Sequence, residues 1–209
     1  MRNTSRIWFS VLAIATLAGL AVASLDWSRQ YVGKSALSME LPGELTADTT
    51  EVIEDKNDWV ASTTDYILDS ENIVLFATVF NGREKVKADH KKLADVMVDL
   101  IVGIGEDTAK VELSKDGKSI EVTPKVGVKQ TTKISVPKFE NGLSVDGRPM
   151  LKATVALKQE DGDSVIKIAL VGDGRNVYSI FGFAGNDDKE GNAAIDRIMN
   201  SIRFKRDIK

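Results

Sequence analysis

The sequence predicts an α+β fold in which an antiparallel β-sheet packs against helices. Stretches of alternating apolar and polar residues recur along the chain, and in its C-terminal half Asp-Gly and Asn-Gly pairs separate them, as in hairpins. One amphipathic helical pattern lies in the middle of the chain and a second one near its end. With 209 residues, 43% of them hydrophobic, the chain is long enough to bury the core of one domain.

The N-terminus has the pattern of a secretory signal peptide over residues 1–23. Arg2 and Arg6 precede an apolar run that ends in the small-residue cleavage pattern Ala-Val-Ala, with Ala23 last. The alternative is an uncleaved anchor over residues 7–25, because this stretch is close to the ~20 residues that span a bilayer. Since basic residues precede the apolar run, both alternatives predict an extracytoplasmic protein, either periplasmic or secreted.

A short lead-in over residues 24–34 is expected to precede a single domain over residues 35–209. The domain begins with Leu37–Leu41 (LSMEL), where apolar and polar residues alternate as in a half-buried strand. Pro42 and Gly43 should end this strand, since proline lacks an amide donor and glycine permits a turn.

Two further strands are predicted at Trp59–Leu68 and Asn72–Gly82. Within the second one, Ile73–Phe80 is apolar on both faces apart from Thr78. Such a pattern is expected of a strand near the middle of a covered sheet.

The segment Arg83–Val102 has the periodicity of an amphipathic helix. Its apolar residues recur every three or four positions and therefore fall on one face. The members of this face are Val86, His90, Leu93, Met97, Leu100 or Ile101, and Ile104. Gly103 and Gly105 follow the last apolar turn and predict the end of the helix.

From about Val111 the pattern changes to short strands separated by turns. The predicted turn pairs are Asp116-Gly117, Asn141-Gly142, Asp146-Gly147, Asp161-Gly162 and Asp173-Gly174. Residues 150–184 form the clearest run, three strands of an antiparallel meander. A final helix is predicted over Asn192–Ile202, followed by the closing residues 201–204 (SIRF).

These segments together resemble the PsbP-like superfamily, which includes DcrB-like exported bacterial proteins. The opening MELPGEL is similar to the start of that domain, and SVDGRPMLKATVAL, VIKIALVGDGRNVYSIFGFA and the helix ending in IMNSIRF are similar to its last strands and closing helix. The chain departs from the family at Leu45, where members often carry an aromatic residue, and in lacking a lipoprotein cysteine. The resemblance implies a PsbP-like fold and a binding or assembly role.

His90 is the only histidine, so a Ser-His-Asp set would have to include it. It lies on the apolar stripe of the predicted helix, between Val86 and Leu93. This position favours a partly buried histidine that packs against the core, and not a catalytic base. No G-x-S-x-G motif occurs, and the absence of cysteine excludes Cys-His chemistry.

The loop Asn186–Asn192 invites comparison with a calcium-binding EF-hand. With Asn186 at position 1, acidic residues fall at positions 3 and 5 and Gly191 at position 6. Position 12, which requires a bidentate Glu, is Arg197, whose charge opposes the ion. A solvated loop that caps the last helix is therefore the favoured interpretation.

A second class of function would be a metal-dependent or small-molecule enzyme that uses Asp161, Asp163, Asp188 and Glu190. Asp161 and Asp173 each precede a glycine, so turn chemistry already accounts for both. We therefore predict no catalytic, cofactor-binding or metal-binding residue.

Two G-x-G sequences, GIGEDT and GDGRN, lack the strand-to-helix setting and full glycine spacing of a phosphate-binding loop. Tyr178, Phe181 and Phe183 lie in one predicted strand, and a core role is favoured for them over a ligand platform. Strand alternation places Phe181 and Phe183 on one face and Tyr178 on the other.

The charge of the chain bears on its class of partner, and its lack of cysteine bears on how the fold is stabilised. Without the first 23 residues, the chain carries 26 basic and 31 acidic side chains, with no basic cluster of the kind that binds nucleic acid. No disulfide can form, so the core alone must hold the fold.

The leading prediction is a non-enzymatic extracytoplasmic binding or assembly-accessory protein whose partner is another envelope or exported protein. The alternatives are the carboxylate enzyme and a membrane-tethered interaction module, which requires a retained N-terminal segment.

Overall fold

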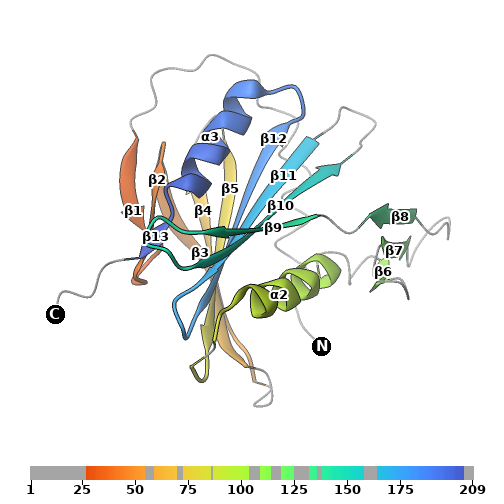
Figure 1. Cartoon of the computed structure of the whole chain (residues 1–209), viewed down its shortest axis with the longest axis horizontal. Helices are drawn as coiled ribbons and strands as arrows, with labels where there is room; N and C mark the ends of the chain where they lie inside the picture. Colours follow the sequence, from red (N-terminus) through yellow and green to blue (C-terminus); the bar gives the residue numbers. More distant parts are fainter. Residues whose placement is uncertain are drawn as a thin grey trace.

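Figure 1 shows the computed structural model of the chain, in which the described residues form mainly β-strands together with two helices. The structure describes residues 27–54, 59–69, 73–85, 87–103, 109–113, 119–124, 132–135, 138–157 and 164–204. The predicted signal peptide, residues 1–23, lies outside these ranges. Within them, neither helix is long and apolar enough to cross a membrane.

A seven-stranded antiparallel sheet forms the middle of the domain (Figure 1). Its strands, in spatial order, are β3 (Glu44–Val52), β4 (Val60–Asp69), β5 (Val74–Gly82), β12 (Val177–Gly185), β11 (Ser164–Gly172), β10 (Pro149–Leu157) and β9 (Phe139–Leu143). The predicted antiparallel meander is confirmed as β10, β11 and β12. β5 lies inside the sheet, between β4 and β12, as its apolar sequence predicts.

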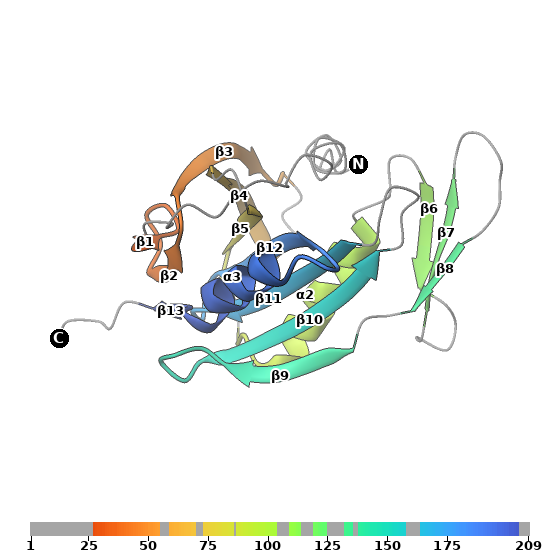
Figure 2. The ribbon, with the colours of Figure 1, turned by 90° about the horizontal axis from the view of Figure 1, so that it is seen from above.

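Two small sheets accompany the central one. The first consists of β1 (Ser28–Tyr31), β2 (Leu37–Leu41) and β13 (Arg203–Phe204), so the predicted lead-in contains a strand that pairs with β2. The second consists of β6 (Ala109–Leu113), β7 (Ser119–Pro124) and β8 (Thr132–Ser135). Figures 1 and 2 show this second sheet set apart from the central sheet.

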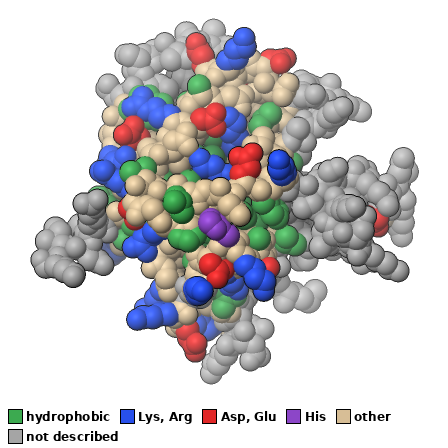
Figure 3. Space-filling model, in the orientation of Figure 1, with side chains coloured by type: hydrophobic (Ala, Val, Ile, Leu, Met, Phe, Trp, Pro, Cys, Tyr) green, Lys and Arg blue, Asp and Glu red, His purple; other side chains and the backbone are tan. Residues whose placement is uncertain are grey.

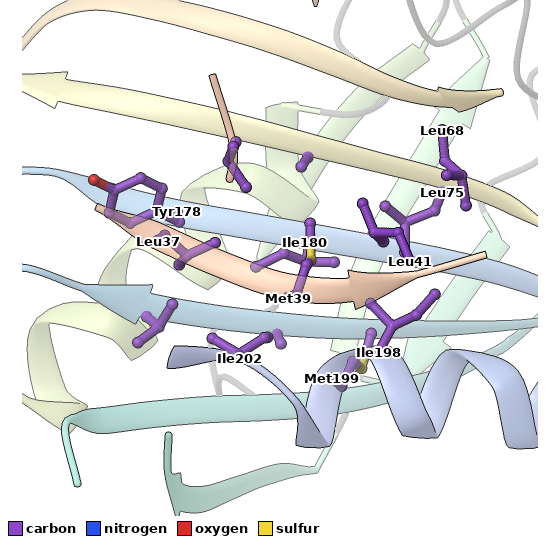
Figure 4. Close-up of a cluster of buried hydrophobic side chains, with 14 of the residues drawn as sticks. Leu37, Met39, Leu41, Leu68, Leu75, Tyr178, Ile180, Ile198, Met199 and Ile202 are labelled. Atoms are coloured by element: carbon purple, nitrogen blue, oxygen red, sulfur yellow. The ribbon is translucent and has the colours of Figure 1, made fainter. Parts of the chain in front are cut away.

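One face of the central sheet is covered by β2 and helix α3 (Lys189–Asn200). Leu37, Met39 and Leu41 are fully buried in this layer. Figure 4 shows them between the ribbon of β2 and the side chains of β12 and α3. The strand predicted at 37–41 is thus confirmed, although it packs across the meander instead of joining it. It is not half-buried as predicted, because Ser38 on its polar side is also buried, where β2 pairs with β13.

Helix α2 (His90–Gly103) covers the opposite face, mainly over β10 and β11. Leu93 and Met97 are fully buried there against Leu151, Ile168 and Leu170. The central sheet therefore has helical layers on both faces, and the predicted α+β class with an antiparallel sheet and packed helices is confirmed.

Helix α2 begins at His90, seven residues after the predicted start at Arg83. Asp89 caps it, because its side chain accepts a hydrogen bond from the backbone amide of Lys92 at 3.0 Å. The backbone amide of Arg83 donates instead to the carbonyl of Trp59, which extends the β4–β5 pairing beyond Gly82. The predicted start was too early because it was based on apolar periodicity alone and did not take the capping residue Asp89 into account.

Helix α3 spans Lys189–Asn200, so the predicted bounds of Asn192–Ile202 are also wrong. Asp188 caps the helix, because its carboxylate accepts a hydrogen bond from the amide of Gly191 at 2.9 Å. Ser201 ends it, with its amide bonded to the carbonyls of Arg197 and Ile198.

The turn predictions had different outcomes. Gly147 and Gly174 have positive φ angles, 83° and 95°, as hairpin turns require. The pair Asn141-Gly142 is not a turn but lies inside β9, where Gly142 pairs with Met150 of β10. The other two pairs, at 116–117 and 161–162, lie outside the described residues.

Strand β3 was not predicted. Its sequence, ELTADTTEV, is polar because the strand is an exposed edge of the sheet. The β3–β4 register shifts between Ala47 and Thr50, which indicates a β-bulge. Bulges and acidic side chains protect sheet edges from pairing with other chains.

Candidate functional site

His90 occupies the first position of α2 and is partly buried. Its Nε2 lies 3.0 Å from the carbonyl oxygen of Gly142, so it donates a hydrogen bond to edge strand β9. Figure 3 shows the single histidine with apolar side chains on either side of it. The geometry is that of a packing histidine that fastens α2 to β9.

The four carboxylates of the enzyme hypothesis are not brought together as far as the structure describes them. Asp161 and Asp163 lie outside the described residues. Asp188 caps α3, and Glu190 is exposed in the first turn of that helix. The described residues contain no group of three His, Cys, Asp or Glu that could hold a metal ion.

The loop compared with an EF-hand becomes helical at Lys189. Arg197, at its position 12, donates hydrogen bonds from Nε and Nη2 to the same oxygen, Oε2, of Glu40 in β2 and lies over the ring of Trp27, 4.0 Å from the centroid. The arginine therefore connects α3 to the β1–β2 sheet, and the segment acts as the start of a helix.

Asp173 of the GDGRN turn makes hydrogen bonds that stabilise the turn itself. Its carboxylate accepts hydrogen bonds from the amides of Arg175 and Asn176 and from the hydroxyl of Tyr178 at 2.7 Å. Burial raises the pKa of Asp173, but these hydrogen bonds outweigh burial and keep the pKa below its ordinary value. The pKa of Tyr178 is raised, mainly by burial and secondly by its hydrogen bond to Asp173 and the negative charge of that residue. The turn is held internally and is not arranged as a phosphate-binding loop.

A hollow on the surface lies beside this turn. It is lined by Arg83, Glu84, Lys85, Asp173, Gly174 and Arg175. Both basic and acidic side chains line it, and Arg175 donates its Nε hydrogen bond to the carbonyl of Gly82 at 3.1 Å. Charges of both signs therefore lie in the hollow, and its lining does not select one class of ion.

A more distinctive surface lies on the α2 side of the central sheet, beyond the strands that α2 covers. Trp59, Phe76, Phe80 and Phe183 are only partly buried there. With Asp65 and Thr78 between them, we call these six residues the aromatic face. Phe181, as predicted, shares this side of the sheet with Phe183, while Tyr178 lies on the other side.

Strand pairing fixes the arrangement of the aromatic face. Asp65 of β4 lies opposite Thr78 of β5, and Phe76 and Phe80 are two residues on either side of Thr78. Side chains two residues apart point to the same face, so both rings flank the carboxylate diagonally. The rings themselves are paired, Phe76 with Phe183 at 5.8 Å and Trp59 with Phe80 at 6.4 Å between centroids.

Asp65 is an unusual group for such a surface. It accepts a hydrogen bond from the Thr78 hydroxyl at 2.6 Å. Burial raises its pKa, the Thr78 hydrogen bond opposes this, and the nearby Asp48 and Glu51 raise it further. The carboxylate is thus partly desolvated beside other acids, an environment that favours the approach of a positive charge.

Sequence reasoning did not identify this face. Thr78 stood out as the one polar residue in an apolar strand, but its partner Asp65 was hidden in the polar alternation of β4. Only the register of β4 against β5 brings the two together.

The comparisons with known proteins assign no family to the chain. No family model matches it, and no curated protein is significantly similar to it.

Proposed function

We propose that the chain is a non-enzymatic extracytoplasmic binding or assembly-accessory protein with a PsbP-like domain, and that a partner protein docks on its aromatic face. The observation that carries this proposal is a set of partly exposed aromatic rings around one carboxylate on the central sheet. Aromatic side chains are enriched at protein interfaces, and a few well-packed residues there carry most of the binding energy.

The fold assignment rests on the order of elements. Strands β10, β11 and β12 followed by α3 are compatible with the last strands and closing helix that the resemblance implies. The role as a binding module follows from that resemblance and is supported by the surroundings of His90 and Asp173, both of which are structural.

Site-specific photo-crosslinking in the native envelope tests the docking surface. A benzophenone amino acid replaces Phe80 on the aromatic face, and the matched control replaces Tyr31, which is 48% exposed on β1. We expect one discrete crosslinked protein from position 80 and none from position 31. The same products from both positions, or none from position 80, would contradict the proposal.

The location is tested separately by the intact mass of the protein recovered from its host. We expect a mature N-terminus at Ser24. A mass that includes residues 1–23 would instead support the membrane-tethered module.

A thermal-shift screen against divalent ions addresses the enzyme alternative, since a large stabilisation by one ion would favour it.

A further inference from the structure

The chemistry of the aromatic face restricts the partner that it can bind. Asp65 has Thr78 as its hydrogen-bond donor, and no basic side chain of the described residues forms an ion pair with it. Because a partly buried carboxylate without a counter-charge is costly, an incoming cation would gain more here than at an exposed acid.

The two charged residues that act on the Asp65 carboxylate, Asp48 and Glu51, are both acidic. The β-bulge of β3 lies beside Asp65 and carries Asp48, and Glu51 follows in the same strand, opposite Thr63. Both acids act on the Asp65 carboxylate. Charge complementarity therefore calls for a positive group at the centre of the aromatic face.

The cation should be organic and not a metal ion. The described acids include no trio spaced to coordinate a metal. The groups that surround Asp65 are instead the rings of Phe76 and Phe80, whose faces attract ammonium and guanidinium groups. The chain supplies an internal example, since Nζ of Lys92 lies 4.9 Å from the centre of the Trp59 ring.

A third polar residue, Ser179, lies on this side of the sheet beside Asp65 and Thr78. Ser179 of β12 pairs directly with Thr78, its side chain is completely buried, and its hydroxyl has no hydrogen-bond partner. Buried hydroxyls in proteins are nearly always bonded. A polar stripe of Asp65, Thr78 and Ser179 thus crosses a face whose other members are mostly apolar.

We infer that the aromatic face recognises a lysine or arginine side chain of a partner polypeptide. Its charged end pairs with Asp65, and its aliphatic stem, with apolar neighbours in the partner, packs against Phe76 and Phe80. This inference rests on the proposed function, because it specifies the chemistry of the partner that docks there.

Two peptides that differ only in charge provide the test. The probes are acetyl-Leu-Arg-Leu-amide and the same peptide with citrulline, a neutral analogue of similar shape, in place of arginine. Each is titrated into the protein as recovered from its host while backbone amide NMR signals are followed. We expect saturable shifts in β4 and β5, with the citrulline peptide bound about tenfold more weakly.

Variants locate the effect. In Asp65→Asn, which retains a hydrogen-bond acceptor for Thr78, the preference for arginine should disappear. In the control Asp187→Asn, an exposed residue before α3 with the same change of charge, the preference should remain. Unchanged amide spectra away from β3–β5 would show that both variants are folded.

The outcomes separate this inference from the proposed function. Equal binding of both peptides on β4 and β5 would overturn the recognition of a cation but leave the aromatic face as a docking surface. Shifts confined to other elements, or an arginine preference that survives in Asp65→Asn, would overturn the inference as well. Failure of the position-80 crosslink would instead count against the proposed function.

Discussion

The substitution Leu41→Asp tests whether β2 is part of the core. Leu41 has no exposed surface and lies in the cluster formed by β2, the central sheet and α3 (Figure 4). Removing a fully buried leucine side chain costs about 2–5 kcal/mol. The new carboxyl group would have no prepared partner, which adds about 1–3 kcal/mol. Taking the low end of both ranges, we expect the free energy of unfolding to fall by about 3 kcal/mol.

Urea unfolding monitored by circular dichroism measures this change, with an unchanged dependence on urea showing that the same surface is exposed on unfolding. The matched control is Val52→Asp on edge strand β3, because Val52 is 72% exposed. That variant should lose less than about 1 kcal/mol. If Leu41→Asp cost no more than the control, β2 would be a solvated segment and the packing argument would be wrong.

Three further predictions concern other positions. Gly182→Ala should destabilise the fold by about 1–3 kcal/mol, because a Cβ at 182 would overlap the side chain of Ile195; Gly142→Ala, whose Cβ would have no neighbour nearer than 3.7 Å, should change thermal stability little. Asp188→Ala should lose about 1 kcal/mol through the missing cap of α3, whereas Asp188→Asn should retain most of it in the same urea assay. Asp65→Asn should gain stability relative to the wild type as pH rises from its ordinary pKa of 3.8 towards neutrality. Below that pH the carboxyl is protonated in both states and no difference is expected, whereas above the raised folded pKa the wild type bears the full cost of the buried charge. A stability difference independent of pH would contradict this last prediction.

Strands with regular alternation could be predicted from the sequence because the two faces of a strand have different surroundings. Leu37–Leu41 and the meander both carry this signal, and both form strands. β3 lacks it, because an edge strand with exposed side chains on both faces imposes no apolar alternation. Helix starts were missed for a related reason, since Asp89 and Asp188 act through single capping hydrogen bonds that periodicity does not record.

The candidate site was beyond prediction because its members are distant in the chain. Asp65 and Thr78 are ordinary polar residues of two different strands, and Trp59 and Phe183 are separated by most of the domain. Their proximity follows from the pairing of β4, β5 and β12. Three residues did stand out in the sequence, and each has a structural role. His90 fastens helix α2 to β9, Asp173 stabilises a turn, and Asp188 caps helix α3.

The sequence by itself determined the α+β class, the meander and the burial of Leu37, Met39 and Leu41, since local apolar patterns select element type and the face that is buried. Only the tertiary structure decided which layer β2 joins: it pairs with β1 and β13 and packs with α3 across the central sheet. Tertiary packing also decided that α2 covers β10 and β11 while the rings around Asp65 stay partly exposed. The physical reason is that a pattern records whether a side chain is buried, whereas its neighbours depend on how distant segments pair and pack.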